Sequence, residues 1–310
     1  MLVKTIAPSR ISLFGGGTDT EPYASTYGGL VLNMAINLRQ TIELQDNWST
    51  QAIVVPDGGS QDFVGAFLKE FKLKDTWVDI KTDVRLNSGM GASATAAVAL
   101  VAAIDRVKGL GLTKEQIAEK AWDIEVNKIG MFGGKQDQYA AALGGVNVLE
   151  FGKEVKVTQL SREFAEKATK GLLLFHTGAI RENPKIQEEM KVLTDERVAA
   201  LDLLKFRVAK GIELIIEGDL EALGAYLDEA WQLKKKSNSK ITSPRIDNIY
   251  DNAKHYGAYG GKLCGSGGGG YMIFIVNPNK KEPFIEKMIK EGLEWVDYSV
   301  DWNGVETRIL

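Results

Sequence analysis

The chain has 310 residues, of which 44% are hydrophobic and 25% are charged, and its formal net charge is -3 at pH 7. These proportions are ordinary for a globular protein with one large or two moderate domains. Acidic and basic residues are interleaved without a polybasic block, which argues against a nucleic-acid partner. No apolar run reaches membrane-spanning length, and the N-terminus lacks the apolar core of a signal peptide. The single cysteine, Cys264, rules out an internal disulfide, so we expect a cytoplasmic protein.

The first half of the chain mixes strand and helix patterns. Alternating apolar residues predict strands over residues 2–6, 30–42, 50–55 and 78–86. Helical spacing predicts helices over residues 63–71, 94–104 and 113–127. The last of these helices opens with the capping-box pair Thr113 and Gln116.

The second half is richer in long, charged helical patterns. It predicts strands over residues 170–176 and 271–276, helices over 184–217, 220–236, 244–255 and 281–292, and a final strand. Asp219 is a plausible N-cap of the helix that follows it. We place a domain boundary between Phe151 and Gly171, which gives an α+β fold with two lobes, residues 1–160 and 171–310.

Glycine concentrates in two loops, Asn87–Ala94 and Gly260–Gly270, and in a segment with an acid, Gly133–Gln138. The first loop runs into an alanine-rich helix, and free N–H groups at a helix N-terminus favour a phosphate. The common P-loop and dinucleotide fingerprints are absent from the sequence. The alternative is a tight strand-to-helix turn whose glycines serve geometry alone. We expect an ATP-dependent small-molecule kinase.

Two acidic residues are candidates for the chemistry. Asp137 stands in the glycine-flanked segment and could take or orient the proton of an attacking hydroxyl, or simply cap the helix from about Gln138. Glu125 lies on the preceding predicted helix and could join Ser93 in a set of oxygen ligands for Mg²⁺. In isolation, Glu125 would be interpreted as a solvated helix residue.

The segment Pro8–Asp19 places an arginine before an apolar strand and a polar, glycine-rich turn after it. Arg10 could keep Asp137 ionised and neutralise charge on a transferred phosphoryl group. Thr18 and Asp19 could hydrogen-bond the hydroxyls of a sugar. The alternative is an ordinary hairpin turn with an Asx cap.

In combination, these segments resemble the GHMP kinase superfamily of galactokinases, homoserine kinases, mevalonate kinases and phosphomevalonate kinases. Arg10–Asp19 is similar to its first motif, Asn87–Ala94 to its second and Gly260–Gly270 to its third, in the expected order. Gly15–Asp19 departs from the Gly-Glu-His-Thr-Asp of galactokinases. With Thr177–Arg181, it resembles the D-glycero-D-manno-heptose 7-phosphate kinase branch, whose members phosphorylate the anomeric C1 hydroxyl.

The resemblance implies a role for each matched residue. Asp137 becomes the catalytic base or orienting carboxylate and Arg10 its partner, while Ser93 and Glu125 become the Mg²⁺ ligands. The triphosphate cradle would consist of Gly89, Met90, Gly91, Ala92, Ser93 and Ala94. The sugar contacts would include Gly17, Thr18 and Asp19, with Gly267 and Gly268 from the loop that closes over the reacting phosphate. The implied fold is an N-terminal lobe with a left-handed βαβ unit and a ferredoxin-like C-terminal lobe.

Met90 and Ala92 replace the leucine and serine common in the second motif, which leaves Ser93 as the one hydroxyl for the metal. Arg181 and Lys262 are candidates for a phosphate already on the substrate, or surface residues. Lys234–Lys236 fit a solvated helix end, because cations are favourable there; the alternative is that one of them binds a phosphate of the substrate. His176 is expected to be structural, and Cys264 to pack as a small residue.

The predicted activity is Mg²⁺- and ATP-dependent phosphorylation of a sugar, with heptose 7-phosphate as the expected acceptor. Two alternatives stay open. One is a kinase for an unphosphorylated sugar, similar to a galactokinase or fucokinase, or for another small alcohol. The other is a non-catalytic nucleotide-binding regulator, which would not need both a base and metal ligands. The sequence is compatible with a monomer or a homodimer.

Overall fold

The structure is a computed structural model that describes residues 1–86, 88–179, 192–237, 239–265 and 267–310. Within these ranges the strands are β1 (Leu2–Phe14), β2 (Gly29–Gln45), β3 (Ala52–Val54), β4 (Trp77–Thr82), β5 (Val146–Phe151), β6 (Lys156–Gln159), β7 (Leu172–His176), β8 (Ala258–Leu263), β9 (Tyr271–Val276), β10 (Glu294–Val296) and β11 (Glu306–Ile309). The helices are α1 (Tyr23–Tyr27), α2 (Gln61–Glu70), α3 (Ala92–Lys108), α4 (Lys114–Trp122), η1 (Asp123–Lys128), α5 (Gln136–Leu143), α6 (Arg162–Thr169), α8 (Asp195–Glu217), α9 (Leu220–Ser237), η2 (Ser239–Ile241), α10 (Pro244–His255), η3 (Pro278–Lys280) and α11 (Lys281–Lys290).

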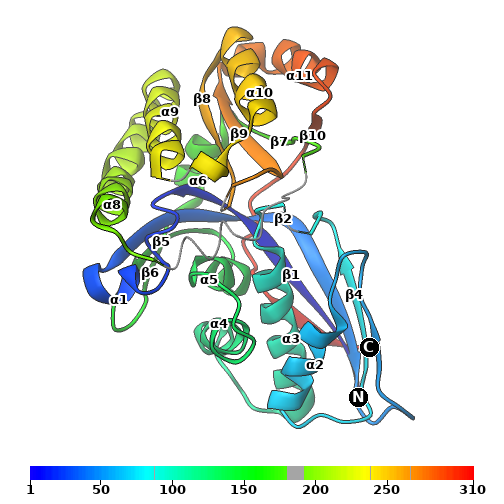
Figure 1. Cartoon of the computed structure of the whole chain (residues 1–310). Helices are drawn as coiled ribbons and strands as arrows, with labels where there is room; N and C mark the ends of the chain where they lie inside the picture. The colour runs from blue at the N-terminus through cyan, green and yellow to red at the C-terminus, as the bar shows by residue number, and fades with distance from the viewer. Residues whose placement is uncertain (87, 180–191, 238, 266) are drawn as a thin grey trace.

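The N-terminal lobe is built on two long antiparallel strands, β1 and β2 (Figure 1). In the described part of the chain, its sheet has the order β11-β1-β2-β4-β3, and β5 and β6 extend it from the first part of β2. The strands β3 and β4 pair in parallel around α2, which gives the βαβ unit that the resemblance implied. Helices α3 and α5 pack on β1 and β2, and α4 packs on α3 and α5.

Helix α3 is the centre of the N-terminal core. Every residue from Ala94 to Ile104 is buried, as the alanine-rich sequence predicted. Small side chains let a helix approach the sheet closely, so the backbone of α3 lies near that of β1. This packing fixes the N-terminus of α3 beside Arg10, whose backbone N–H donates to Met90 O over 3.4 Å.

The C-terminal lobe is ferredoxin-like. Its antiparallel sheet has the order β10-β7-β9-β8, and the strands follow each other along the chain with α8, α9 and α10 after β7 and α11 after β9. This strand order and the two helical crossovers define the ferredoxin-like arrangement. A core of aromatic and aliphatic residues, including Phe175, Phe274 and Phe284, packs between the sheet and α10 and α11.

The chain ends beside its start. Strand β11 pairs with β1, and the Leu310 N–H donates to Leu2 O over 3.0 Å, so the termini lie side by side (Figure 1). The domain limits 1–160 and 171–310 stay a prediction; the second sheet begins at Leu172, and the last strand joins the first sheet. Among the helices of the described ranges, none is both long and apolar enough to cross a membrane.

Three predicted element boundaries differ most from the structure. The strand expected over residues 2–6 continues to Phe14, because its pairing with β2 extends that far. The strand expected over residues 78–86 ends at Thr82, because pairing with β2 stops at Gln40. The helix expected over residues 184–217 begins at Asp195 in the described part, because the Thr194 hydroxyl caps it by accepting from Arg197 N. The capping box at Thr113 and the N-cap at Asp219 are confirmed.

Candidate active site

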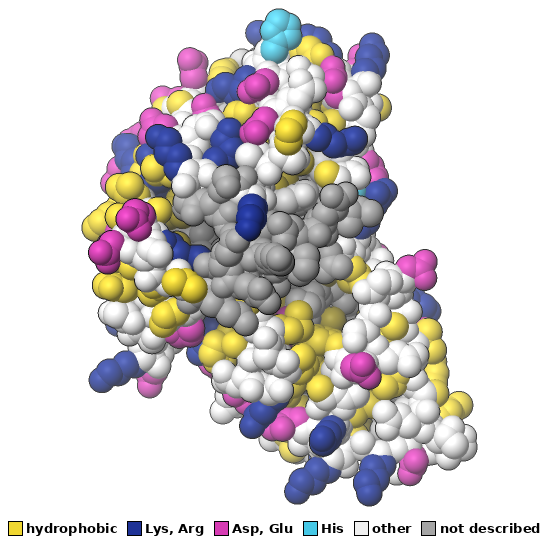
Figure 2. Space-filling model, in the orientation of Figure 1, with side chains coloured by type: hydrophobic (Ala, Val, Ile, Leu, Met, Phe, Trp, Pro, Cys, Tyr) yellow, Lys and Arg dark blue, Asp and Glu magenta, His cyan; other side chains and the backbone are white. Residues whose placement is uncertain are grey.

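A cavity of about 530 Å³ lies between the lobes. Its walls come from the end of β1 and the turn after it, the N-termini of α3 and α5, and the C-terminal elements α8, α9 and β8. All three glycine-rich segments border it. On the face drawn in Figure 2, basic and acidic side chains are interspersed over both lobes.

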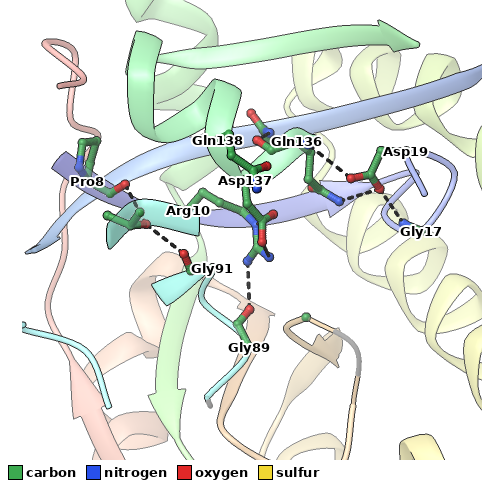
Figure 3. Close-up of polar contacts among 12 residues, drawn as sticks. Pro8, Arg10, Gly17, Asp19, Gly89, Gly91, Gln136, Asp137 and Gln138 are labelled. Carbon is green, nitrogen blue, oxygen red and sulfur yellow. Dashed lines mark hydrogen bonds and ion pairs between the residues drawn. The ribbon is translucent and has the colours of Figure 1, made fainter. Parts of the chain in front are cut away.

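Arg10 and Asp137 form a two-pronged ion pair in this cavity (Figure 3). Arg10 Nε donates to Asp137 Oδ1 over 2.6 Å and Nη2 to Oδ2 over 2.8 Å, while Nη1 donates to Gly89 O over 2.8 Å. Burial alone would lower the pKa of Arg10, but the charge and hydrogen bonds of Asp137 outweigh that cost, so the pKa lies above its ordinary value. The guanidinium therefore joins the carboxylate to the phosphate loop and holds both in place.

The second-motif loop opens α3 in the way a phosphate site requires. Gly91 is the N-cap in a left-handed conformation, with φ of +74°, and no side chain caps the helix. A Cβ atom on Gly91 would lie 2.9 Å from Asp137 Oδ2, so this glycine lets the carboxylate approach the loop. Ser93 is exposed on the cavity wall, whereas Met90, Ala92 and Ala94 are buried.

The third glycine loop packs against the second. Gly265 lines the cavity, and Lys234 Nζ donates to its carbonyl oxygen. Gly268 N donates to Ile241 O over 2.8 Å, and a Cβ on Gly267 would lie 2.8 Å from Ile241. In the described structure Gly267 and Gly268 lie against η2 and not on the cavity wall. The contact of Gly267 and Gly268 with the substrate stays a prediction.

Asp19 contacts the N-terminus of α5 (Figure 3). Its carboxylate accepts from Gly17 N over 3.0 Å, from Gln136 N over 3.2 Å and from Gln136 Nε2 over 2.9 Å. A Cβ on Gly134 would overlap this carboxylate. Burial, followed by repulsion from Asp137, raises the pKa of Asp19. Asp19 and Gly17 line the cavity, and Asp19 also holds the helix that carries Asp137.

Thr18 does not line the cavity. Its side chain is fully buried, and its hydroxyl bonds the backbone of Gly15 and Leu30. The prediction that Thr18 contacts the sugar is corrected, because its hydroxyl instead holds the glycine-rich turn against β2.

Glu125 lies on the π-helical turn η1 and is 5% exposed. The pKa of its carboxyl is raised to about 7, mainly by burial and also by the charge of Asp137. Hydrogen bonds from Ser93 and Gln138 act in the opposite direction. Gln138 Nε2 donates to Glu125 Oε2 over 2.8 Å, and Gln138 Oε1 is buried without a hydrogen-bond partner. Single π-helical turns are often found at functional sites.

The hydroxyl of Ser93, the carboxylate of Glu125 and the orphaned amide oxygen of Gln138 are hard oxygen donors, which Mg²⁺ prefers. A cation would also favour the ionised form of Glu125, which burial opposes. These residues therefore fit Mg²⁺. Within the described ranges, no group of three or more His, Cys, Asp or Glu side chains is arranged to hold a metal.

Lys262 comes from β8 and reaches the cavity beside Arg10. It is 9% exposed, and its ammonium donates to Leu13 O over 2.8 Å. Burial, followed by repulsion from Arg10, lowers its pKa to about 8. A buried ammonium whose described hydrogen-bond partner is a carbonyl carries charge that an incoming anion would neutralise. Arg181 lies outside the described residues.

Two further basic side chains line the cavity from the C-terminal lobe. Arg207 on α8 pairs with Glu229 over 2.8 Å and stacks on Tyr226, and Lys234 on α9 contacts Gly265. Sequence analysis missed Arg207, because it stands in a charged helical pattern typical of a solvated face. For Lys234 the sequence favoured a solvated helix end over a contact with a substrate phosphate; the structure places Lys234 on the cavity wall.

The cavity continues into an apolar region of the N-terminal lobe. Side chains from α2, β4, α3 and the segment after η1 line it, including Phe63, Ile80, Ala96, Ile129 and Phe132. His176 and Cys264 are buried in the core as predicted. His176 stacks edge-on against Tyr271, and its Nδ1 accepts from Gly178 N over 3.2 Å.

Comparison with known proteins identifies the family. The family described as GHMP kinases N terminal domain matches residues 61–145, and the family described as GHMP kinases C terminal matches residues 212–294. The D-glycero-alpha-D-manno-heptose 7-phosphate kinase of Campylobacter jejuni is 31% identical over 333 residues, covering 98% of each chain. The chain belongs to the GHMP kinase superfamily. It is a sugar kinase, an ATP-dependent phosphotransferase.

Other relatives place this GHMP kinase among enzymes for several acceptors. The L-fucokinase/L-fucose-1-P guanylyltransferase of Bacteroides fragilis is 26% identical over 354 residues, which are 92% of this chain and 36% of that protein. The crystal structure of a D-glycero-D-manno-heptose 1-phosphate kinase from Bacteroides thetaiotaomicron has a TM-score of 0.81 at 24% identity, over 99% of both chains. This last likeness supports the fold.

Proposed function

We propose that this GHMP kinase transfers the γ-phosphoryl group of ATP to the C1 hydroxyl of D-glycero-D-manno-heptose 7-phosphate. The observation that carries the proposal is the cavity wall, where Lys262, Arg207 and Lys234 stand in addition to the Arg10–Asp137 pair. A transferred phosphoryl group needs cations, and an acceptor that already carries a phosphate needs more of them. The named activity of the Campylobacter jejuni relative, 31% identical over 98% of its length, supports the same acceptor.

ATP fits the cavity in one direction. The apolar region beside Phe63, Ile80 and Ile129 suits the adenine base, since nucleotide bases are held mainly by apolar and aromatic walls. The triphosphate then crosses the N-terminus of α3, where Gly89–Ala94 offer N–H groups and the positive end of the helix dipole. This direction brings the γ-phosphate to Arg10 and Lys262, at the border between the lobes.

The acceptor then lies beside Asp137 and Asp19. Asp137 accepts a hydrogen bond from the reacting hydroxyl and receives its proton as the oxygen bonds the γ-phosphorus, while the bond from that phosphorus to the bridging oxygen of ADP breaks. The Arg10 guanidinium keeps the carboxylate in place and stabilises negative charge on the transferred group. Ser93 and Glu125, with Gln138 beside them, would hold Mg²⁺, which when bound neutralises phosphate charge.

The alternative acceptors make different demands on the cavity. An unphosphorylated sugar, as in the Bacteroides fragilis relative named a fucokinase, would leave part of the basic wall without a role. A non-catalytic regulator would not need a carboxylate held by a buried arginine at the mouth of a phosphate loop. We therefore favour a phosphorylated acceptor over both.

The test is ADP release with Mg²⁺ and ATP against D-glycero-D-manno-heptose 7-phosphate, mannose 6-phosphate, mannose, galactose and fucose. We expect the highest kcat/KM with the heptose 7-phosphate. A higher kcat/KM with a free sugar would retain the kinase and overturn the phosphorylated acceptor. A positional assay of the product, by phosphorus NMR, then tests whether the new phosphate is on C1.

A further inference from the structure

Gln136 is the first residue of α5 and directly precedes Asp137. It lines the cavity, and 7% of it is exposed. Its backbone is held from two sides, because Gln136 N donates to Asp19 Oδ2 over 3.2 Å and Asn33 Nδ2 donates to Gln136 O over 3.0 Å. The side chain therefore leaves a fixed backbone beside the carboxylate that orients the reacting hydroxyl.

The orientation of the Gln136 amide follows from its neighbour. Gln136 Nε2 donates to Asp19 Oδ1 over 2.9 Å, and both oxygens of Asp19 also accept backbone N–H groups. A carboxylate accepts and an amide has a distinct donor and acceptor, so the NH₂ group must be the end that faces Asp19. The amide oxygen, Oε1, then faces away from Asp19.

Gln136 Oε1 is buried and has no hydrogen-bond partner among the described residues, and the same holds for Ser12 Oγ. Ser12, like Gln136, lines the cavity and is almost fully buried. Gly16 separates them: a Cβ there would lie 2.7 Å from Ser12 Oγ and 3.5 Å from Gln136 Nε2. Buried polar atoms are normally paired, so orphaned oxygens on two side chains that line one cavity indicate a polar ligand, and an amide oxygen can pair only with a donor such as a hydroxyl.

We propose that Gln136 Oε1 accepts a hydrogen bond from a second hydroxyl of the sugar, one that does not react, and that Ser12 Oγ completes this contact. Gln136 is then a specificity-determining residue that requires a hydroxyl at one ring position. The inference rests on the proposed placement of the acceptor beside Asp137, but not on the acceptor being a heptose. The carboxylate of Asp19 already accepts hydrogen bonds from the first residue of α5, so we assign the discrimination between sugars mainly to Gln136.

The competing role is structural, in which the Gln136 amide only holds Asp19 in place. A selectivity ratio separates the two roles, because a brace affects all acceptors equally. The ratio is kcat/KM for the parent sugar divided by kcat/KM for an analogue that lacks one hydroxyl. The parent is the panel sugar with the highest turnover, and the probes are its monodeoxy analogues at each non-reacting ring position.

In the wild-type protein, we expect one monodeoxy analogue to lose at least about tenfold in kcat/KM, because a site built to bond a hydroxyl rejects a sugar without it. In Gln136→Met, this ratio falls to below about threefold, while the ratios for the other analogues stay unchanged. Gln138→Met is the matched control, since Gln138 also has an orphaned Oε1 on α5 but lies off the cavity wall. It lowers turnover through Glu125 and leaves every ratio as in the wild type.

Equal ratios in the wild type and Gln136→Met would overturn the proposal and leave Gln136 as a brace for Asp19. If Gln136→Met does not fold, the wild-type ratios decide: monodeoxy analogues that all stay within about threefold of the parent contradict a hydroxyl-reading site. The proposed function fails separately, when the panel shows another acceptor than the heptose 7-phosphate. The ratios can then still be measured with that acceptor.

Discussion

Gly89 and Gly265 touch across the border between the two lobes. A Cβ atom on Gly265 would lie 2.5 Å from Gly89 Cα, and one on Gly89 would lie 2.5 Å from Cys264 O. Both residues have positive φ, +83° and +68°. The second-motif loop of the N-terminal lobe is thus held directly by the third-motif loop of the C-terminal lobe, backbone against backbone.

Gly265→Ala is expected to displace the phosphate loop. The new methyl group must push Gly89 away and also adopt a left-handed conformation, so we expect a loss of about 1–3 kcal/mol in stability and at least about tenfold in kcat/KM for ATP. The matched control is Gly218→Ala at the C-cap of α8, where φ is +74° and nothing lies within 4 Å. Steady-state kinetics and urea unfolding check both variants; a Gly265→Ala enzyme with unchanged ATP kinetics would show that the contact is not needed.

Asp137→Asn is expected to lower kcat by about 10²–10⁴-fold, because the reacting hydroxyl loses its proton acceptor. The affinity for ATP changes little, since the loop N–H groups that would bind the phosphates stay in place. Stopped-time ADP release gives kcat, and titration with a fluorescent ATP analogue gives the affinity. A comparable loss in both quantities would contradict a chemical role for Asp137 and assign it to loop structure.

The sequence predicted the parts of the site that depend on local patterns. The glycine loop before an alanine-rich helix, the pairing of Arg10 with Asp137 and the buried strand Tyr271–Val276 all agree with the structure. The glycines were expected to bring backbone close to a ligand. Several instead bring backbone close to other parts of the chain, as Gly134 does for Asp19 and Gly270 does for Ser88.

The remaining features depend on contacts between distant segments. Arg207 stands on a helix whose pattern is that of a charged surface, and only the packing of α8 against the N-terminal sheet turns it toward the cavity. Thr18 lies in the first motif, yet its hydroxyl bonds backbone oxygens of neighbouring segments and not a ligand. Sequence spacing indicates that a loop lies near the site, but it does not indicate which of the loop's atoms are free to contact a ligand.

Glu125→Gln is expected to change how stability depends on pH in the protein without metal or nucleotide. The folded pKa of Glu125 is raised from 4.5 to about 7. The protonated carboxyl therefore makes its full contribution to the free energy of unfolding of the wild type below about pH 4.5. This contribution falls by about 3 kcal/mol as the pH rises through about 7. The variant lacks this loss, so its stability relative to the wild type rises with pH. Urea unfolding at pH 5 and pH 8 measures the difference; a constant difference would contradict the raised pKa.

Lys262→Met is expected to stabilise the protein at pH 7 while impairing turnover. Burial lowers the folded pKa of Lys262 to about 8, so the charged form weakens the fold below that pH, and the wild type regains stability as pH rises from 8 toward 10.5. The gain of the variant, about 1–2 kcal/mol after the lost bond to Leu13 O, is therefore largest below pH 8. It is lost between pH 8 and pH 10.5, where the missing bond leaves the variant less stable than the wild type. Its kcat/KM falls at least about tenfold, because the phosphoryl group loses a cation.

Urea unfolding at pH 7 and pH 10 measures the change in stability, and ADP release at pH 7 measures the change in turnover. The control is Lys235→Met, which breaks a pair with Asp247 away from the cavity wall. A variant less stable than the wild type at pH 7, with normal turnover, would place Lys262 in the structural framework of β8 and not in the phosphate site.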